Sequence, residues 1–113
     1  MDRDFDWAEG MACAVTAADK DGVIRYMNRR ARETYRKHGD LVGKSLFDCH
    51  GERAAGIIRR LLAEGGTNSY TIEKEGVRKM IYQTACTDAG GQVEGIVEVS
   101  MVIPGELPHY VRG

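Results

Sequence analysis

The side chains best suited to chemistry in this sequence are Cys49 and His50, which stand next to each other. A thiol beside an imidazole suggests a metal site, a haem ligand or an activated cysteine nucleophile. A mononuclear zinc site needs three or four protein ligands, and His38 and His109 are far away along the chain. A nucleophile needs a base and an oxyanion hole, which no motif supplies. We therefore expect no catalytic residue, no metal site and no enzymatic activity.

A plainer interpretation places residues 48–51 in a loop that leads into a helix. Asp48 or His50 would cap that helix, and Cys49 would be a small buried apolar residue. The helix itself is predicted over residues 52–64, because its apolar residues recur at helical spacing and Gly65 follows as a stop signal.

The elements that position this loop begin with a turn, a strand and a capped helix. Asp21 and Gly22 form a tight-turn signal between predicted strands over residues 12–18 and 23–27. Asn28 is a good N-cap for a helix predicted over residues 29–37.

Three further strands are predicted over residues 68–73, 78–87 and 93–103. Two strands, a helical middle and a three-strand meander indicate an α+β fold. We expect one five-stranded antiparallel sheet in the order 2-1-5-4-3, with the helices packed on one face.

Composition limits the remaining possibilities. A chain of 113 residues has room for one domain, and a net charge of -1 disfavours nucleic acid as a partner. The acidic N-terminus and the absence of a long apolar run predict no signal peptide and no membrane span. Three cysteines, an odd number, fit free thiols in the cytoplasm. We divide the chain into an N-terminal cap segment (1–10), one domain (11–103) and a C-terminal tail (104–113).

Several short motifs occur in a characteristic order. They are Asp-Lys-Asp-Gly-Val-Ile at 19–24, Tyr-Met-Asn at 26–28, Val-Gly-Lys-Ser-Leu at 42–46 and the closing strand at 91–100. Together they resemble the PAS domain family, and the likeness covers residues 11–103. Within these motifs, we expect Asp21, Gly22, Asn28 and Gly43 to have structural roles.

The resemblance implies a sensory or signalling module that binds a small ligand or a protein partner and relays a conformational change. Such domains hold their ligand between the sheet and the helices. The cavity-lining residues expected here are Ile24, Met27, Leu46, Phe47, Ile57, Leu61, Tyr82, Thr84 and Val97. A packed core without ligand is the alternative, and the domain would then serve homodimerisation or another protein interaction.

The resemblance does not decide whether the domain binds a cofactor. Photosensory PAS domains carry a reactive cysteine where this chain has Leu46, so a flavin–cysteine adduct is excluded, although flavin without an adduct is not. Haem-binding PAS domains place their iron ligand where this chain has Ile58, which cannot ligate iron. A haem sensor that uses His50 instead is a second alternative.

The predicted partner is a second copy of the chain. The last strand mixes polar with apolar residues on one of its faces, as a sheet face does when it binds a second subunit. We expect a homodimer through the outer sheet face, with Phe5 and Trp7 of the N-terminal segment helping to cover it. The tail does not resemble a coiled-coil linker, which favours a stand-alone protein.

Overall fold

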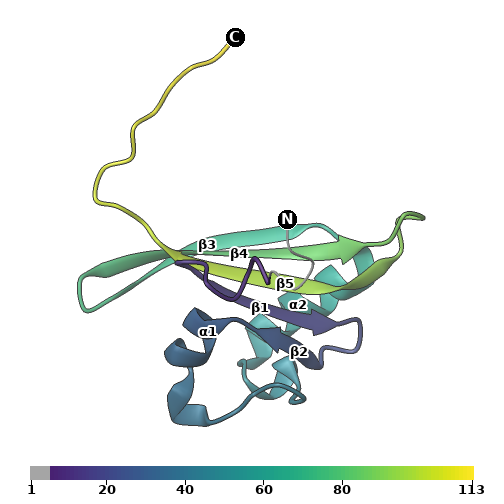
Figure 1. Ribbon diagram of the computed structural model, residues 1–113. Coiled ribbons are helices and arrows are strands. Elements are labelled where there is room, and N and C mark those ends of the chain that lie inside the picture. The colour runs from purple at the N-terminus through teal and green to yellow at the C-terminus, as the bar shows by residue number, and fades with distance from the viewer. Residues whose placement is uncertain (1–5) are drawn as a thin grey trace.

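A five-stranded antiparallel sheet with its helices on one face forms the body of the molecule (Figure 1). The computed structural model describes residues 6–113. The elements in chain order are β1 (Ala14–Asp19), β2 (Ile24–Met27), α1 (Arg29–Thr34), the 3-10 helices η1 (Arg36–His38) and η2 (Leu46–Asp48), α2 (Glu52–Glu64), β3 (Thr67–Lys74), β4 (Val77–Thr87) and β5 (Val93–Val102). The sheet order β2-β1-β5-β4-β3 is the predicted one.

The hydrophobic core lies between the sheet and the helices. Ile58 and Leu61 of α2 are almost fully buried, and they belong to one cluster with Ile96 of β5 and Ile24 of β2. The apolar stripe of α2 therefore packs against the inner face of the sheet, as its helical periodicity predicts. The C-terminal tail leaves β5 on the opposite side of the sheet (Figure 1).

The first helix is shorter than the sequence predicts. It ends at Thr34, whose hydroxyl donates to the carbonyl of Arg30 at 2.8 Å, and η1 follows. A hydroxyl that bonds to the preceding turn competes with the helical backbone pattern. Gly39 then stops the segment with a φ of 72°. The interruption leaves Tyr35 between the two helical pieces, half-buried against the core.

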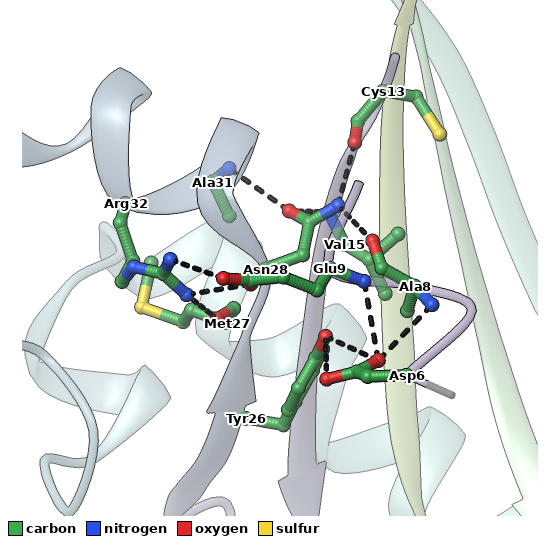
Figure 2. Close-up of polar contacts among 10 residues, drawn as sticks. All are labelled: Asp6, Ala8, Glu9, Cys13, Val15, Tyr26, Met27, Asn28, Ala31 and Arg32. Carbon is green, nitrogen blue, oxygen red and sulfur yellow. Dashed lines mark hydrogen bonds and ion pairs between the residues drawn. The ribbon is translucent and has the colours of Figure 1, made fainter. Parts of the chain in front are cut away.

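Asn28 connects three parts of the fold (Figure 2). Its side-chain oxygen accepts from the backbone N–H of Ala31, which confirms the predicted N-cap, and also from the N–H of Val15 at 2.9 Å. Its amide nitrogen donates to the carbonyls of Ala8 and Cys13, both at 2.8 Å. The fully buried Asn28 thus joins α1, β1 and the N-terminal segment.

The N-terminal segment is also held by charged and polar side chains (Figure 2). Glu9 forms a two-armed ion pair with Arg32 of α1, and Asp6 accepts a hydrogen bond from the Tyr26 hydroxyl at 3.1 Å. Trp7 is 67% exposed, so its ring gives the sheet little cover. The predicted contribution of Phe5 lies outside the described residues.

Two glycines shape the approach to the helical face. Gly22, in the turn after β1, has a φ of 80°, and a Cβ there would lie 2.6 Å from the Phe47 ring. Gly43 has a φ of 91° and lies beside the start of β2, where its N–H donates to the carbonyl of Ile24 at 2.7 Å. Left-handed backbone at both positions favours glycine. The carboxylate that closes the first turn is Asp19 rather than Asp21, because Asp19 accepts from the N–H groups of Asp21 and Val23.

Candidate ligand cavity

A row of polar side chains crosses the inner face of the sheet. The strand register pairs Thr16 with Glu98, Glu98 with Gln83, and Gln83 with Asn68, so the four side chains lie in line across β1, β5, β4 and β3. Asn68 Nδ2 donates to Gln83 Oε1, and Gln83 Nε2 donates to Glu98 Oε2, each at 3.0 Å. We call these four residues the polar row. They place a hydrogen-bonded carboxylate under the helices.

A cavity of about 620 Å³ opens above the Thr16 and Glu98 end of the polar row. Its walls come from β2, the α1–η1 segment, the 41–46 segment and the loop before α2. The lining residues are Thr16, Ile24, Met27, Tyr35, His38, Leu41, Gly43, Lys44, Ser45, Leu46, Asp48, Cys49, His50 and Glu98. The cavity is thus apolar on the side of β2 and polar on the sheet floor and at the rim. Mixed walls of this kind are typical of small-molecule sites.

Tyr35 is the aromatic side chain of this wall. Burial raises the pKa of its hydroxyl to about 12, and the negative charge of Glu98 adds to the effect. Tyr70 of β3 lies on the inner face of the sheet, and burial and the charge of Glu98 raise the pKa of its hydroxyl as well. Both phenols are therefore neutral at physiological pH, and both lie close enough to the Glu98 carboxylate to be affected by its charge.

His50 and Cys49 stand at the rim of the cavity. His50 Nδ1 lies 2.8 Å from the carbonyl oxygen of Leu46, and because a carbonyl can only accept, Nδ1 carries a proton. This contact fixes the ring and directs Nε2 away from the backbone. Cys49 is an exposed free thiol, and Cys13 and Cys86 are also free. The predicted capping role of Asp48 or His50 is wrong, because Gly51 is the N-cap of α2 and no side chain bonds there.

The residues predicted to line the cavity fall into three groups. Ile24, Met27 and Leu46 line it. Phe47, Ile57 and Leu61 pack in the neighbouring core, and Arg59 stacks over the Phe47 ring at 4.7 Å. The third group, described next, lies on the other side of the sheet.

Tyr82, Thr84 and Val97 are on the outer face, and the prediction that they line the cavity is wrong. Thr84 pairs with Val97 in the register, whereas Gln83 and Glu98 form the adjacent pair that points inward. Successive residues of a strand point to opposite faces, so these two sets cannot share a side. Tyr82 is 37% exposed, because the helices of the described chain all lie on the other face of the sheet (Figure 1).

Sequence reasoning missed Glu98, Thr16 and Tyr35. Glu98 stands between two valines and Gln83 between Tyr82 and Thr84, and a polar side chain is normally assigned to solvent. The signal available was their common register: in antiparallel strands joined by the 88–91 turn, Gln83 faces Glu98 directly. Two polar residues in register across central strands indicate a hydrogen-bonded pair.

Two further findings concern metal sites and membrane-spanning helices. Within 6–113, no cluster of three or more His, Cys, Asp or Glu side chains could hold a metal ion. No helix in that range is both long and apolar enough to cross a membrane.

Comparison with known proteins identifies the family. Residues 8–103 match the profile of the PAS fold, and the chain therefore belongs to the PAS family. No curated protein gave a sequence match. PAS domains are sensory modules of signalling proteins, and they are generally not catalytic.

Solved structures show the same fold at low sequence identity. A C-terminal domain from Streptococcus mutans is 18% identical with a TM-score of 0.69, over 84% of this chain and 78% of that one. The PAS domain of the histidine kinase ThkA is 20% identical with a TM-score of 0.64, over 80% of this chain and 99% of that one. The Vibrio cholerae Aer2 receptor, described as a dual PAS-heme oxygen sensor, is 22% identical with a TM-score of 0.57, over 85% of this chain and 98% of that one.

Proposed function

We propose that this PAS domain is a sensor that binds a small molecule in the cavity above Glu98. The observation that carries the proposal is the cavity of about 620 Å³, whose floor presents a carboxylate held in place by hydrogen bonds. A concave site with apolar walls and a few oriented polar groups is the usual form of a ligand site. Binding would shift the population of conformers rather than drive a reaction.

A blocked cavity tests this proposal. Cys49→Trp places an indole at the rim, and Glu64→Trp places the same ring at an exposed end of α2 that does not line the cavity, as a matched control. Native mass spectrometry of the purified protein and thermal-shift screening of metabolites should find ligands that bind the wild type and Glu64→Trp but not Cys49→Trp. Ligands that bind all three proteins equally would place the site elsewhere. If no ligand is found, the alternative of a ligand-free interaction module is favoured.

We further propose that the output passes through the outer sheet face to a second copy of the chain. This face carries exposed apolar side chains such as Tyr82 and Met101, and no helix within residues 6–113 covers it. Tyr82→Asp should weaken the dimer in sedimentation experiments, whereas Tyr70→Asp, at a similarly exposed tyrosine on the opposite face, should not. A wild-type chain that stays monomeric at high micromolar concentration would refute this proposal.

Haem binding through His50 is a second candidate function. It is favoured by the Nδ1 contact to Leu46, which leaves Nε2 as the atom able to ligate iron, and a similar fold occurs in a protein described as a heme sensor. The polar floor of the cavity argues against it, because Glu98 would face the apolar ring. Haemin titration should give a Soret band that His50→Ala removes and His38→Ala preserves. No band with the wild type would refute it.

We also propose that the protein is cytoplasmic; three free thiols support this, because a reducing compartment maintains them. Modification of all three by a thiol reagent in intact cells before lysis, compared with modification after lysis, tests the redox state directly. Disulfide-linked protein in that assay would contradict the assignment.

A further inference from the structure

The carboxylate of Glu98 has one oxygen committed and one oxygen open. Oε2 accepts from Gln83, and within residues 6–113 no Lys, Arg or His nitrogen forms an ion pair with either oxygen. No fully buried side-chain oxygen or nitrogen in the same range lacks a hydrogen-bond partner. Glu98 is only partly buried, so its second oxygen has access to the cavity that the residue lines.

The position of this carboxylate is set by its neighbours. Gln83 is 3% exposed and uses both ends of its amide, since its oxygen accepts from Asn68 and its nitrogen donates to Glu98. The amide therefore cannot rotate to offer another group without losing both bonds. A carboxylate in a partly desolvated site, held in one orientation and without a counter-charge, favours a cation.

The charges around the rim leave this preference in place. The ionisable groups that line the cavity besides Glu98 are Tyr35, His38, Lys44, Asp48, Cys49 and His50. Lys44 and Asp48 are both exposed and opposite in sign, so they offset each other at the rim. Tyr35 presents an aromatic ring, which attracts cations, and the charge of Glu98 contributes to the raised pKa of its hydroxyl.

We propose that the ligand is a small organic cation with an ammonium or amidinium group and an apolar body. This inference depends on the proposed ligand-binding function and names the ligand class. The charged end would pair with the open oxygen of Glu98. The apolar body would pack against Ile24, Met27 and Leu46 on the opposite wall. Organic anions would be repelled from the same floor.

Benzamidine and benzamide test this directly, because they have nearly the same shape and differ in charge. Binding is followed through the backbone amide shifts of the cavity residues in isotope-labelled protein at neutral pH. The variant Glu98→Gln removes the charge and keeps an oxygen that can accept from Gln83. Glu94→Gln, at an exposed site on β5 that does not line the cavity, is the matched control.

We expect the affinity for benzamidine to be at least about tenfold higher in the wild type and in Glu94→Gln than in Glu98→Gln, which is a difference of about 1.4 kcal/mol in binding free energy. Benzamide should bind all three proteins equally weakly. If benzamide binds the wild type as tightly as benzamidine, the ligand class is wrong while the cavity remains a ligand site. If neither probe shifts the cavity residues, the inference is overturned, and the metabolite screen with Cys49→Trp decides separately on the proposed function.

Discussion

Replacement of Asn28 by alanine should be one of the most damaging single substitutions in this chain. Asn28 is fully buried, and its side chain makes four hydrogen bonds, to the N–H groups of Val15 and Ala31 and to the carbonyls of Ala8 and Cys13. Alanine removes all four bonds and cannot replace any of them.

The size of the effect follows from these four bonds. Loss of the N-cap contact costs about 1 kcal/mol. The other three backbone groups lose their partner in or next to the core, and each unsatisfied buried group costs roughly 1–3 kcal/mol. We expect a total loss of at least about 4 kcal/mol, which is a large part of the roughly 5–15 kcal/mol that stabilises a domain of this kind.

Urea denaturation followed by circular dichroism measures this loss. Asn68→Ala is the matched control, because Asn68 is also an asparagine facing the core but makes a single side-chain bond; it should cost about 1 kcal/mol. A value for Asn28→Ala within 1 kcal/mol of wild type would refute the reasoning.

If the alanine variant does not fold, Asn28→Asp provides the same test. Aspartate keeps the acceptor oxygen but turns a second oxygen toward the carbonyls of Ala8 and Cys13, which sit 2.8 Å from the present nitrogen. A protonated carboxyl can donate to one of them again. The stability gap between Asn28→Asp and wild type should therefore narrow at acidic pH. A gap that does not change with pH would contradict the contact of this side chain with the two carbonyls.

Three further predictions concern turns and ionisable groups. Gly22→Ala should lower the free energy of unfolding by about 3 kcal/mol, because it combines left-handed backbone with a clash against the Phe47 ring. Gly43→Ala, which is left-handed but in open space, should lower it by about 1 kcal/mol. Equal losses of stability in urea denaturation would contradict the clash. The pKa of Asp19 is lowered, first by the hydrogen bond that its carboxylate accepts from Arg25. The stability that Asp19 contributes is therefore present at neutral pH and is lost as the pH falls through its folded-state pKa. Asp19→Asn should therefore show a smaller fall in urea midpoint between neutral pH and about pH 3 than wild type; an unchanged acid profile would refute this. The pKa of Tyr35 is raised to about 12 by burial and by the nearby carboxylate, so the stability that it contributes is complete below about pH 10 and is lost as the pH rises toward that value. Tyrosinate absorbance should show late-titrating phenols, and Tyr35→Phe should remove one of them. A titration unchanged by that substitution would show that Tyr35 is solvated.

The local features of this fold could be predicted from the sequence because they depend on neighbours along the chain. The spacing of Ile57, Ile58 and Leu61 is enough to define α2, whose bounds agree with the prediction. Asn28 was predicted as an N-cap because an asparagine ahead of a helical segment has an N–H to accept from. Each of these inferences involves residues a few positions apart.

The same sequence did not show how much Asn28 does beyond capping. Its two donor bonds reach Ala8 and Cys13, which are 20 and 15 positions away. Those contacts exist only after β1 and the N-terminal segment have come together beside α1. No local pattern distinguishes an asparagine that caps a helix from one that also joins three segments.

The candidate site depended on a choice that strand alternation leaves open. Alternation separates Gln83 from Tyr82 and Thr84, and Glu98 from Val97, but it does not say which set faces the helices. The sequence predicts Tyr82, Thr84 and Val97 on the inside and the mixed polar and apolar face of the last strand on the outside. The structure has the two faces the other way round, with Gln83 and Glu98 inside beside the buried Ile81 and Ile96.

The amino-acid sequence by itself determined the elements, their order and the glycine turns, because steric limits and hydrogen bonds between near neighbours decide these. The tertiary structure alone decided which face of the sheet is covered. Once Gln83 binds both Asn68 and Glu98, both ends of its buried amide are paired and one oxygen of Glu98 is held in place beneath the helices. These bonds offset the cost that normally keeps such residues in solvent, so the polar row can lie among the buried apolar residues of the inner face, and its Thr16 and Glu98 end forms the floor of the cavity.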